Sequence, residues 1–177
     1  MKIAVLLAGG DRRSIGQSNT VAAIVRKQPA RFAELIDCLW NADAIVRMRA
    51  ADAAEKVSAL RPELLAPFKA ELLGLLVESE QQEVQWHLAQ MVPRLPLTDD
   101  ERRRATAAFR GYLTRRGSLV RTAGMQALAD LAESSPRRRV EVAELIEQLM
   151  RTGTPAMQAR GRHLLKHLRA LESSALR

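Results

Sequence analysis

A motif that recurs at a nearly constant spacing constrains the fold of this chain more than any other feature. Twelve-residue segments beginning at Val46, Val84, Val120 and Met157 align, and their starting positions differ by 38, 36 and 37 residues. Each copy has apolar or small residues at offsets 0, 4, 7, 8 and 11, the apolar stripe of an amphipathic α-helix. Because each unit has to bury this stripe against its neighbours, the period predicts a stack of similar helical units.

A second amphipathic series lies between these segments, so each repeat is predicted to be a helical hairpin. Its members cover residues 32–40, 63–77, 101–113 and 140–150. Offset 4 of the second helices includes Gly124 and Gly161, which are small enough to let a neighbouring helix approach closely. Pro67 and Pro93 fall inside helical patterns, and we expect a bend at one or both because proline removes a backbone donor.

Capping signals agree with these boundaries. Thr98 and Glu101 have the spacing of a capping box, and Ser135 and Thr154 each precede a proline that suits the first helical position. Asp43 stands in the same place as Thr154, three residues before its repeat begins. We therefore predict one all-α domain over residues 1–177, with an N-terminal cap (1–28) and repeats at about 29–60, 61–97, 98–134 and 135–171.

The first dozen residues permit another interpretation. An apolar run followed by Gly9, Gly10 and Asp11 is similar to a first strand with a phosphate loop, as at the start of phosphofructokinases. Such a loop needs a parallel sheet, and the helical pattern downstream leaves no room for one. We favour a short helix that ends at Gly9 or Gly10, followed by a second helix through Val21 that caps the first hairpin.

With a period near 37 and second helices of the form Val-Arg-x-x-Ala-x-x-Ala-Leu, residues 29–171 resemble HEAT repeats. The resemblance implies a right-handed α-α superhelix that acts as a scaffold for other macromolecules, and it does not imply enzymatic chemistry. It also implies that Arg47 and Arg121 help to hold adjacent repeats together. Gln85 and Gln158 occupy the same offset in the other two copies and depart from the pattern.

Composition and charge limit the classes of function. The longest apolar run, Ile3 to Ala8, is too short to cross a bilayer and precedes no convincing cleavage site, so we expect a cytoplasmic protein without a membrane segment. The lone Cys38 is predicted to be a small core residue. All of the net charge of +8 lies in residues 94–177. The candidates for polyanion contacts there are Arg102, Arg103, Arg104, Arg115, Arg116, Arg137, Arg138 and Arg139.

Residue patterns typical of catalysis or of metal binding are scarce. The sequence has no spaced cysteine and histidine set, no Gly-x-Ser-x-Gly and no lysine-bearing phosphate loop. His163 and His167 are four residues apart, but Lys166 between them would repel a cation. We therefore expect no enzymatic activity, no cofactor and no metal.

Second helices line the concave face of a helical solenoid, so their offsets outside the core stripe are the candidates for binding. Trp86 is the foremost of them as an interface anchor, unless a small rotation of its helix packs it between repeats. The candidates are Met48, Arg49, Asp52, Trp86, His87, Gln90, Arg94, Gln126, Arg160 and His163.

These observations favour a protein-binding scaffold or adaptor, monomeric or weakly dimeric, that uses its concave face. The alternative is a nucleic-acid-binding protein that uses the basic C-terminal half. The helical-repeat DNA glycosylases of alkylation repair are a similar group with a basic groove. Their sites need several aromatic residues around an acid, however, and here only Trp86 and Asp52 are at hand.

Overall fold

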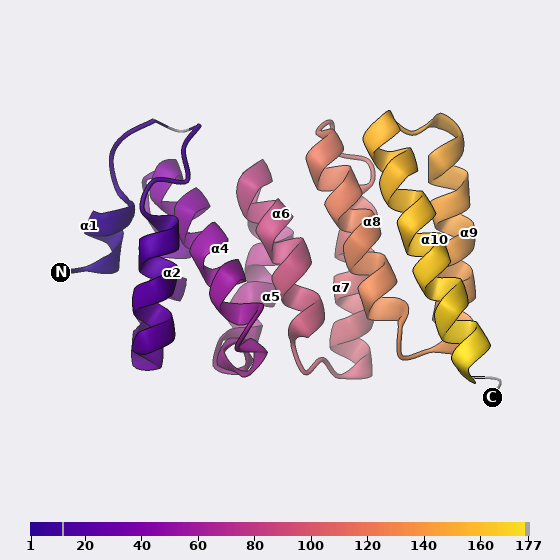
Figure 1. Cartoon of the computed structure of the whole chain (residues 1–177), viewed down its shortest axis with the longest axis horizontal. Helices are drawn as coiled ribbons and strands as arrows, with labels where there is room; N and C mark the ends of the chain where they lie inside the picture. Colours follow the sequence, from indigo (N-terminus) through magenta and orange to yellow (C-terminus); the bar gives the residue numbers. More distant parts are fainter. Residues whose placement is uncertain (12, 176–177) are drawn as a thin grey trace. The chain divides into compact units, whose positions relative to one another are not determined.

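The computed structural model describes residues 1–11 and 13–175 (Figure 1). Those residues form ten α-helices and four short 3-10 segments, with no β-strand among them. The helices pack in pairs like those of a helical-repeat solenoid, which confirms the predicted all-α repeat fold. The chain divides into two compact units, Met1–Pro96 and the part from Leu97 onward. No helix in the described part is both long and apolar enough to span a bilayer.

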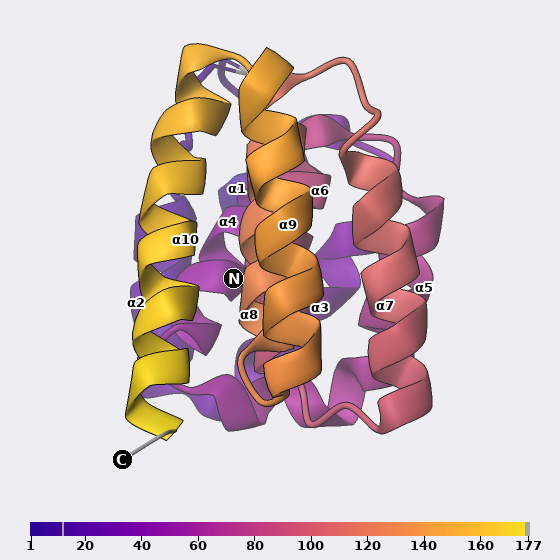
Figure 2. The ribbon, with the colours of Figure 1, turned by 90° about the vertical axis from the view of Figure 1, so that its right-hand side faces the viewer.

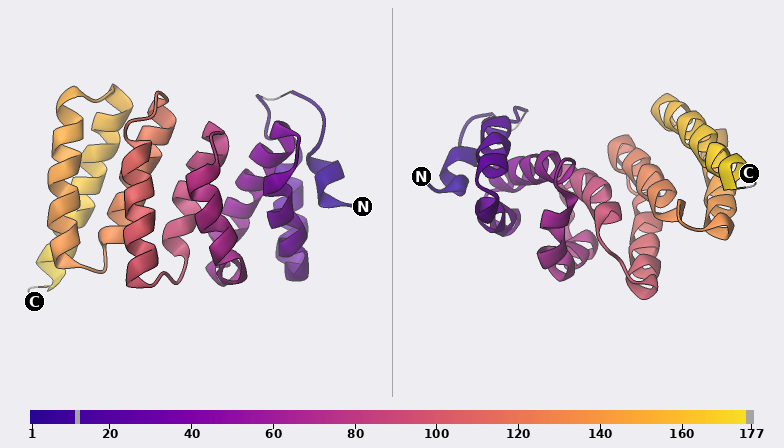
Figure 3. Two further views of the ribbon diagram at one scale, coloured as in Figure 1. Left: turned by 180° about the vertical axis from the view of Figure 1, so that it is seen from behind. Right: turned by 60° about the horizontal axis from the view of Figure 1, so that its bottom comes forward.

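The first unit contains the N-terminal helices and two hairpins. Its elements are α1 (Ile3–Leu7), α2 (Ser18–Lys27), a 3-10 turn (Pro29–Arg31), α3 (Phe32–Asp37) with a 3-10 extension (Cys38–Trp40), α4 (Ala44–Ser58), a 3-10 segment (Pro62–Phe68), α5 (Lys69–Glu78) and α6 (Gln82–Met91) with a 3-10 extension (Val92–Arg94). The second helices α4 and α6 pack against each other, and α2 also packs against α4 (Figure 3). The middle helix, α4, therefore has neighbours on two sides.

The second unit contains two hairpins. Its helices are α7 (Asp99–Tyr112), α8 (Ser118–Ala132), α9 (Pro136–Thr152) and α10 (Pro155–Ala175). The second helix α8 packs against α7, α9 and α10 (Figure 2). The four repeat segments found in the sequence thus lie on α4, α6, α8 and α10, as the period predicted.

Helix starts follow the predicted caps. The side chain of Asp43 accepts a hydrogen bond from the amide of Ile45 at 2.8 Å. A complete capping box joins Thr98 and Glu101, with N to O distances of 2.8 and 3.3 Å. The hydroxyls of Ser135 and Thr154 accept from amides three residues further on. Local signals in the sequence therefore fix where these helices begin.

Both internal prolines lie in 3-10 segments rather than at bends inside α-helices. Pro67 belongs to the segment that precedes α5, and Pro93 to the one that follows α6. A proline cannot donate the hydrogen bond of a regular α-helix, and the 3-10 form accommodates that loss at the end of an element.

The N-terminal segment is helical, as the capping interpretation predicted. Ile3 and Leu7 are fully buried on the inner face of α1. Gly9 and Gly10 have φ angles of 73° and 77°, a conformation that glycine adopts without steric cost, and they end the helix.

Close helix contacts occur at the predicted glycines of the second unit. A Cβ atom at Gly124 would lie 3.0 Å from the Cβ of Tyr112, and one at Gly161 would lie 2.6 Å from Cγ of Met150 and overlap its Sδ. Both glycines therefore allow a first helix to pack directly on the second helix of its hairpin.

Candidate functional site

Arg49 on α4 was expected to face an open groove, and the structure corrects this. Its side chain is 3% exposed. The guanidinium donates to the carbonyl oxygens of Leu7 (2.8 Å), Gly9 (2.5 Å), Asp11 (3.0 Å) and Ser14 (3.1 Å). Arg49 thus uses four of its five N–H donors to hold the loop between α1 and α2 in place, and it is buried away from a partner.

Asp52 and His87 also lie inside the first unit rather than on a groove. The carboxylate of Asp52 accepts from the hydroxyl of Ser18 on α2 and from Lys56 at 2.6 Å. The His87 ring, 4% exposed, has its Nε2 atom 3.8 Å from the same carboxylate. The network joins α2, α4 and α6, so these side chains connect the helices internally. Met48 is likewise buried, at 9% exposure.

Burial lowers the pKa of His87 below its ordinary value of 6.5, against the opposing influence of Asp52 and Glu55 and with support from Lys56. Its Nδ1 atom is buried without a hydrogen-bond partner. The folded state therefore favours the neutral form of the His87 imidazole.

This shift predicts a pH-dependent stability. The unfolded chain takes up a proton on His87 near pH 6.5, whereas the folded chain takes it up only at a lower pH. The free energy of unfolding is therefore highest above pH 6.5 and decreases as the pH falls below that value. We expect the free energy of unfolding, measured in urea at pH 7.5 and at pH 5.5, to fall more in the parent protein than in His87→Gln. Equal falls in both proteins would contradict the assignment.

Trp86 is the one candidate on α6 that presents a large surface. It is 37% exposed, and its ring lies against the His87 ring with centroids 4.6 Å apart. Gln90, half-buried, donates weakly to the Trp86 carbonyl at 3.4 Å. Arg94 forms an ion pair with Glu55 of α4 at 2.6 Å. Trp86 thus remains a candidate anchor, whereas Arg94 is already occupied.

Three of the four residues at offset 1 of the second helices hold the loops that precede them, whereas the Nε atom of the fourth, Arg121, is buried without a hydrogen-bond partner. Arg47 donates to the carbonyl of Asn41 at 2.7 Å and also to Gln81 at 3.0 Å, which belongs to the next hairpin. Gln85 and Gln158 donate to loop carbonyls six and five residues before them. The glutamines therefore keep the contact to their own loop, and Arg47 adds the contact between repeats.

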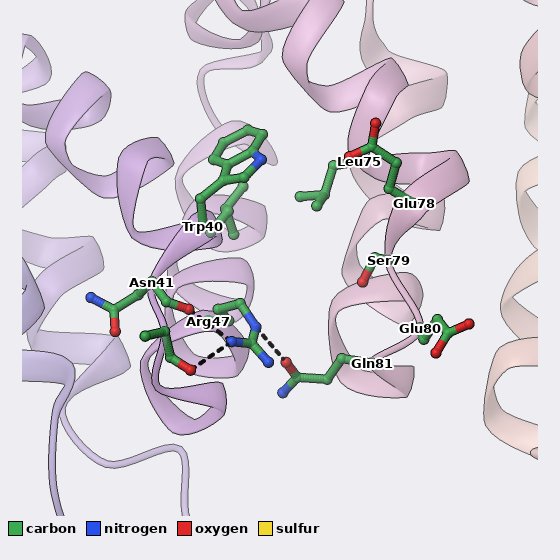
Figure 4. A pocket seen from close by; sticks show the side chains of 10 residues that line it. Trp40, Asn41, Arg47, Leu75, Glu78, Ser79, Glu80 and Gln81 are labelled. Carbon is green, nitrogen blue, oxygen red and sulfur yellow. Dashed lines mark hydrogen bonds between the residues drawn. The ribbon is translucent and has the colours of Figure 1, made fainter.

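Arg47 and Gln81 form one side of an open cavity of about 500 Å3 within the first unit (Figure 4). The hydrogen bond from Arg47 to Gln81 joins the two hairpins across it, while Trp40 and Leu75 lie on opposite sides in the view. We call this cavity the Trp40 groove. Its lining residues are Leu39, Trp40, Asn41, Ala42, Arg47, Leu75, Glu78, Ser79, Glu80 and Gln81.

The Trp40 groove combines an aromatic face with acidic groups. Trp40 is 46% exposed, although the apolar pattern of its helix places it next to core residues. Glu78, the last residue of α5, and Glu80, in the loop that follows, are exposed, and neither forms an ion pair with a described residue. Sequence reasoning missed this site, because it looked only at second helices. The available signals were a tryptophan at the end of a first helix and two glutamates in the loop of the next hairpin.

In the second unit, three predicted residues come together on α8 and α10. Arg160 donates to Gln126 at 3.2 Å across the two helices. An open cavity of about 480 Å3 adjoins them, and His163 and Thr122 are part of its lining. His167 pairs instead with Glu133 at 2.7 Å. Within the described residues, no three histidine, cysteine or acidic side chains are placed to hold a metal.

Most of the predicted polyanion contacts are engaged inside the second unit. Arg103 and Arg104 both pair with Asp100, at 2.9 and 3.1 Å. Arg102 and Arg139 donate to backbone carbonyls at the end of α8. Arg137 pairs with Glu141 and Arg138 with Asp99. Arg115 and Arg116, in contrast, are exposed and form no ion pair with a described residue.

Neither a protein-family model nor a curated protein matches the chain. Two solved structures are similar to it in fold. One is the crystal structure of an engineered protein, Northeast Structural Genomics Consortium target OR329, with TM-score 0.64, 19% identity and coverage of 96% of this chain and 78% of that one. The other is an engineered protein, target OR366, with TM-score 0.64, 18% identity and coverage of 95% and 80%. The chain thus has the fold of an all-helical repeat protein.

Proposed function

We propose that this chain is a non-enzymatic, HEAT-like protein-binding module, and that the Trp40 groove takes a basic side chain from a partner protein. The observation that carries the proposal is that the half-exposed Trp40 and the exposed Glu78 and Glu80, which form no ion pair with a described residue, line one cavity. Tryptophan is the aromatic ring that attracts an ammonium or guanidinium group best.

The electrostatics of the groove favour a cation. Arg47 is the one basic residue in the lining, and its guanidinium already donates to Gln81 and to two loop carbonyls. The two glutamates outweigh its charge. A volume of about 500 Å3 falls in the range of cavities that bind small molecules, so it accommodates one long side chain with part of its backbone.

Preorganisation also supports binding here. The groove walls belong to consecutive hairpins that Arg47 and Gln81 hold together, and the amide of Gln81 donates in return to the Ala44 carbonyl at 2.8 Å. A partner side chain would therefore enter a site that is already ordered, which lowers the entropic cost of binding.

Catalysis has less support. In the first unit, the carboxylate and imidazole that lie closest, Asp52 and His87, are both buried and hold three helices together. A general base has to reach a substrate, and both of these groups are buried between helices.

Selection from a displayed library of random twelve-residue peptides tests the proposal. We expect peptides selected on the parent protein to be enriched in arginine or lysine next to apolar residues, and to lose binding on Trp40→Ala. The matched control is Trp86→Ala, which removes the other exposed tryptophan and should leave these peptides bound. Selected peptides that bind Trp40→Ala and the parent protein equally well would refute the proposal.

A further inference from the structure

Charge within the second unit is segregated between its two ends. Residues 97–177 carry 16 basic and nine acidic side chains. At the end where α7 and α9 begin, the arginine runs meet acids: Arg103 and Arg104 pair with Asp100, and Arg138 pairs with Asp99. Those basic side chains are largely neutralised.

The opposite end has no acidic residue to balance it. There α7 and α9 end and α8 and α10 begin, and residues 102–129 and 148–171 contain no Asp or Glu. Of the nine exposed arginines on these segments, Arg103, Arg104 and Arg169 form ion pairs, and the other six form none with a described residue. We call them the basic end: Arg110, Arg115, Arg116, Arg151, Arg160 and Arg162.

Packing places Arg116 and Arg151 near one another at this end of the unit. The hydroxyls of Ser118 and Thr154 are 3.0 Å apart, which joins the start of α8 to the start of α10. Arg116 and Arg151 stand two and three residues before those positions, so their Cα atoms are within about 12 Å of the bond on either side. Arg160 reaches across to Gln126 on α8 at 3.2 Å.

Backbone dipoles add to the positive potential at the basic end. Both α8, of 15 residues, and α10, of 21 residues, begin there, and the N-cap of α8 is Gly117, which has no capping side chain. Each helix start contributes about half a positive charge and free amide donors.

We propose that the basic end binds the phosphate backbone of double-stranded nucleic acid. Phosphates are the partners that a cluster of unpaired arginines suits best. A duplex is favoured over a single strand because the aromatic rings of this unit, Phe109 and Tyr112, are 0% and 2% exposed and offer no surface on which bases could stack. This binding is separate from the Trp40 groove, which lies in the other unit.

Two triple variants with the same change of charge test the proposal. The first is Arg115→Gln/Arg116→Gln/Arg151→Gln at the basic end, and the matched control is Arg103→Gln/Arg104→Gln/Arg137→Gln at the neutralised end. All six side chains are exposed, and circular dichroism verifies that both variants remain helical. Anisotropy with labelled 20-base-pair DNA and RNA duplexes, a 20-nucleotide single strand and polyglutamate gives the affinities over a salt series.

We expect the parent protein to bind duplexes with an affinity that falls linearly on a log-log salt plot. The basic-end variant should bind about 10- to 100-fold more weakly near 0.1 M salt, with a slope reduced by about 0.9 for each phosphate that is no longer neutralised. The control should stay within about twofold of the parent. The proposal would be overturned if the parent protein did not bind duplexes, or if both variants lost affinity equally. It would also be overturned if the parent protein bound the single strand or polyglutamate as tightly as a duplex. A difference between DNA and RNA duplexes would identify which backbone is preferred.

Discussion

Replacing Arg49 with alanine is expected to destabilise the first unit by about 3 kcal/mol. The guanidinium is buried and satisfies four backbone carbonyls between Leu7 and Ser14. Without it, those oxygens lose their charged donor and the loop from Ala8 to Gln17 loses its main attachment to α4. Urea unfolding measures the change, and hydrogen exchange should show faster exchange in this loop first.

Three further variants make this prediction specific. Arg49→Lys keeps the charge but lacks the planar fork, so we expect a partial loss. Gly16→Ala should loosen the same loop, because a Cβ there would lie 2.6 Å from Cζ of Arg49 and the residue has a φ of 51°. Arg61→Ala removes an exposed arginine paired with Glu63 and should cost less than about 0.5 kcal/mol. A cost that small for Arg49→Ala would show that the loop does not depend on it.

Replacing Gly161 with leucine is expected to destabilise the second unit by about 2–3 kcal/mol. The glycine lies on α10 where α9 crosses it, and a Cβ there would overlap Sδ of Met150 and lie 3.2 Å from Cγ2 of Ile146. A larger side chain has to push the two helices apart. The thermal unfolding midpoint and the urea midpoint should both decrease.

Gly111→Leu is the matched control for that substitution. Gly111 also lies within a helix, α7, but a Cβ there meets nothing within 4 Å. The better helix propensity of leucine should therefore stabilise the protein by about 0.5–1 kcal/mol. Equal effects at Gly161 and Gly111 would contradict the close packing of α9 on α10.

Local and periodic features of the fold were predictable from the sequence. The period located α4, α6, α8 and α10, and the capping residues Thr98, Ser135 and Thr154 marked helix starts to within a residue or two. Both kinds of signal act over one helix turn or one repeat, so they are visible in a single chain.

The exposure of individual side chains was less predictable. Periodicity placed Arg49, Asp52 and His87 on an outer face, but it could not show that α2 and the preceding loop cover α4. The Trp40 groove was missed because its walls come from first helices and loops of different hairpins. Likewise, the arginine runs looked equivalent in the sequence, and only the packing shows that Arg103 and Arg137 are paired while Arg115 and Arg116 are not.

A fluorescence titration tests whether the Trp40 groove accepts a basic side chain. In the Trp86→Phe background, Trp40 is the one remaining tryptophan, so its emission reports on the groove alone. The probes are N-acetyl-arginine amide, N-acetyl-leucine amide and N-acetyl-glutamate amide at constant ionic strength. A variant with Glu78→Gln and Glu80→Gln serves as the control.

Binding of a basic side chain in this groove predicts a saturable change in Trp40 emission with the arginine amide, little change with the other two probes, and loss of the response in the double glutamine variant. Identical responses to the three amides, or an arginine response that persists unchanged without the two carboxylates, would contradict it.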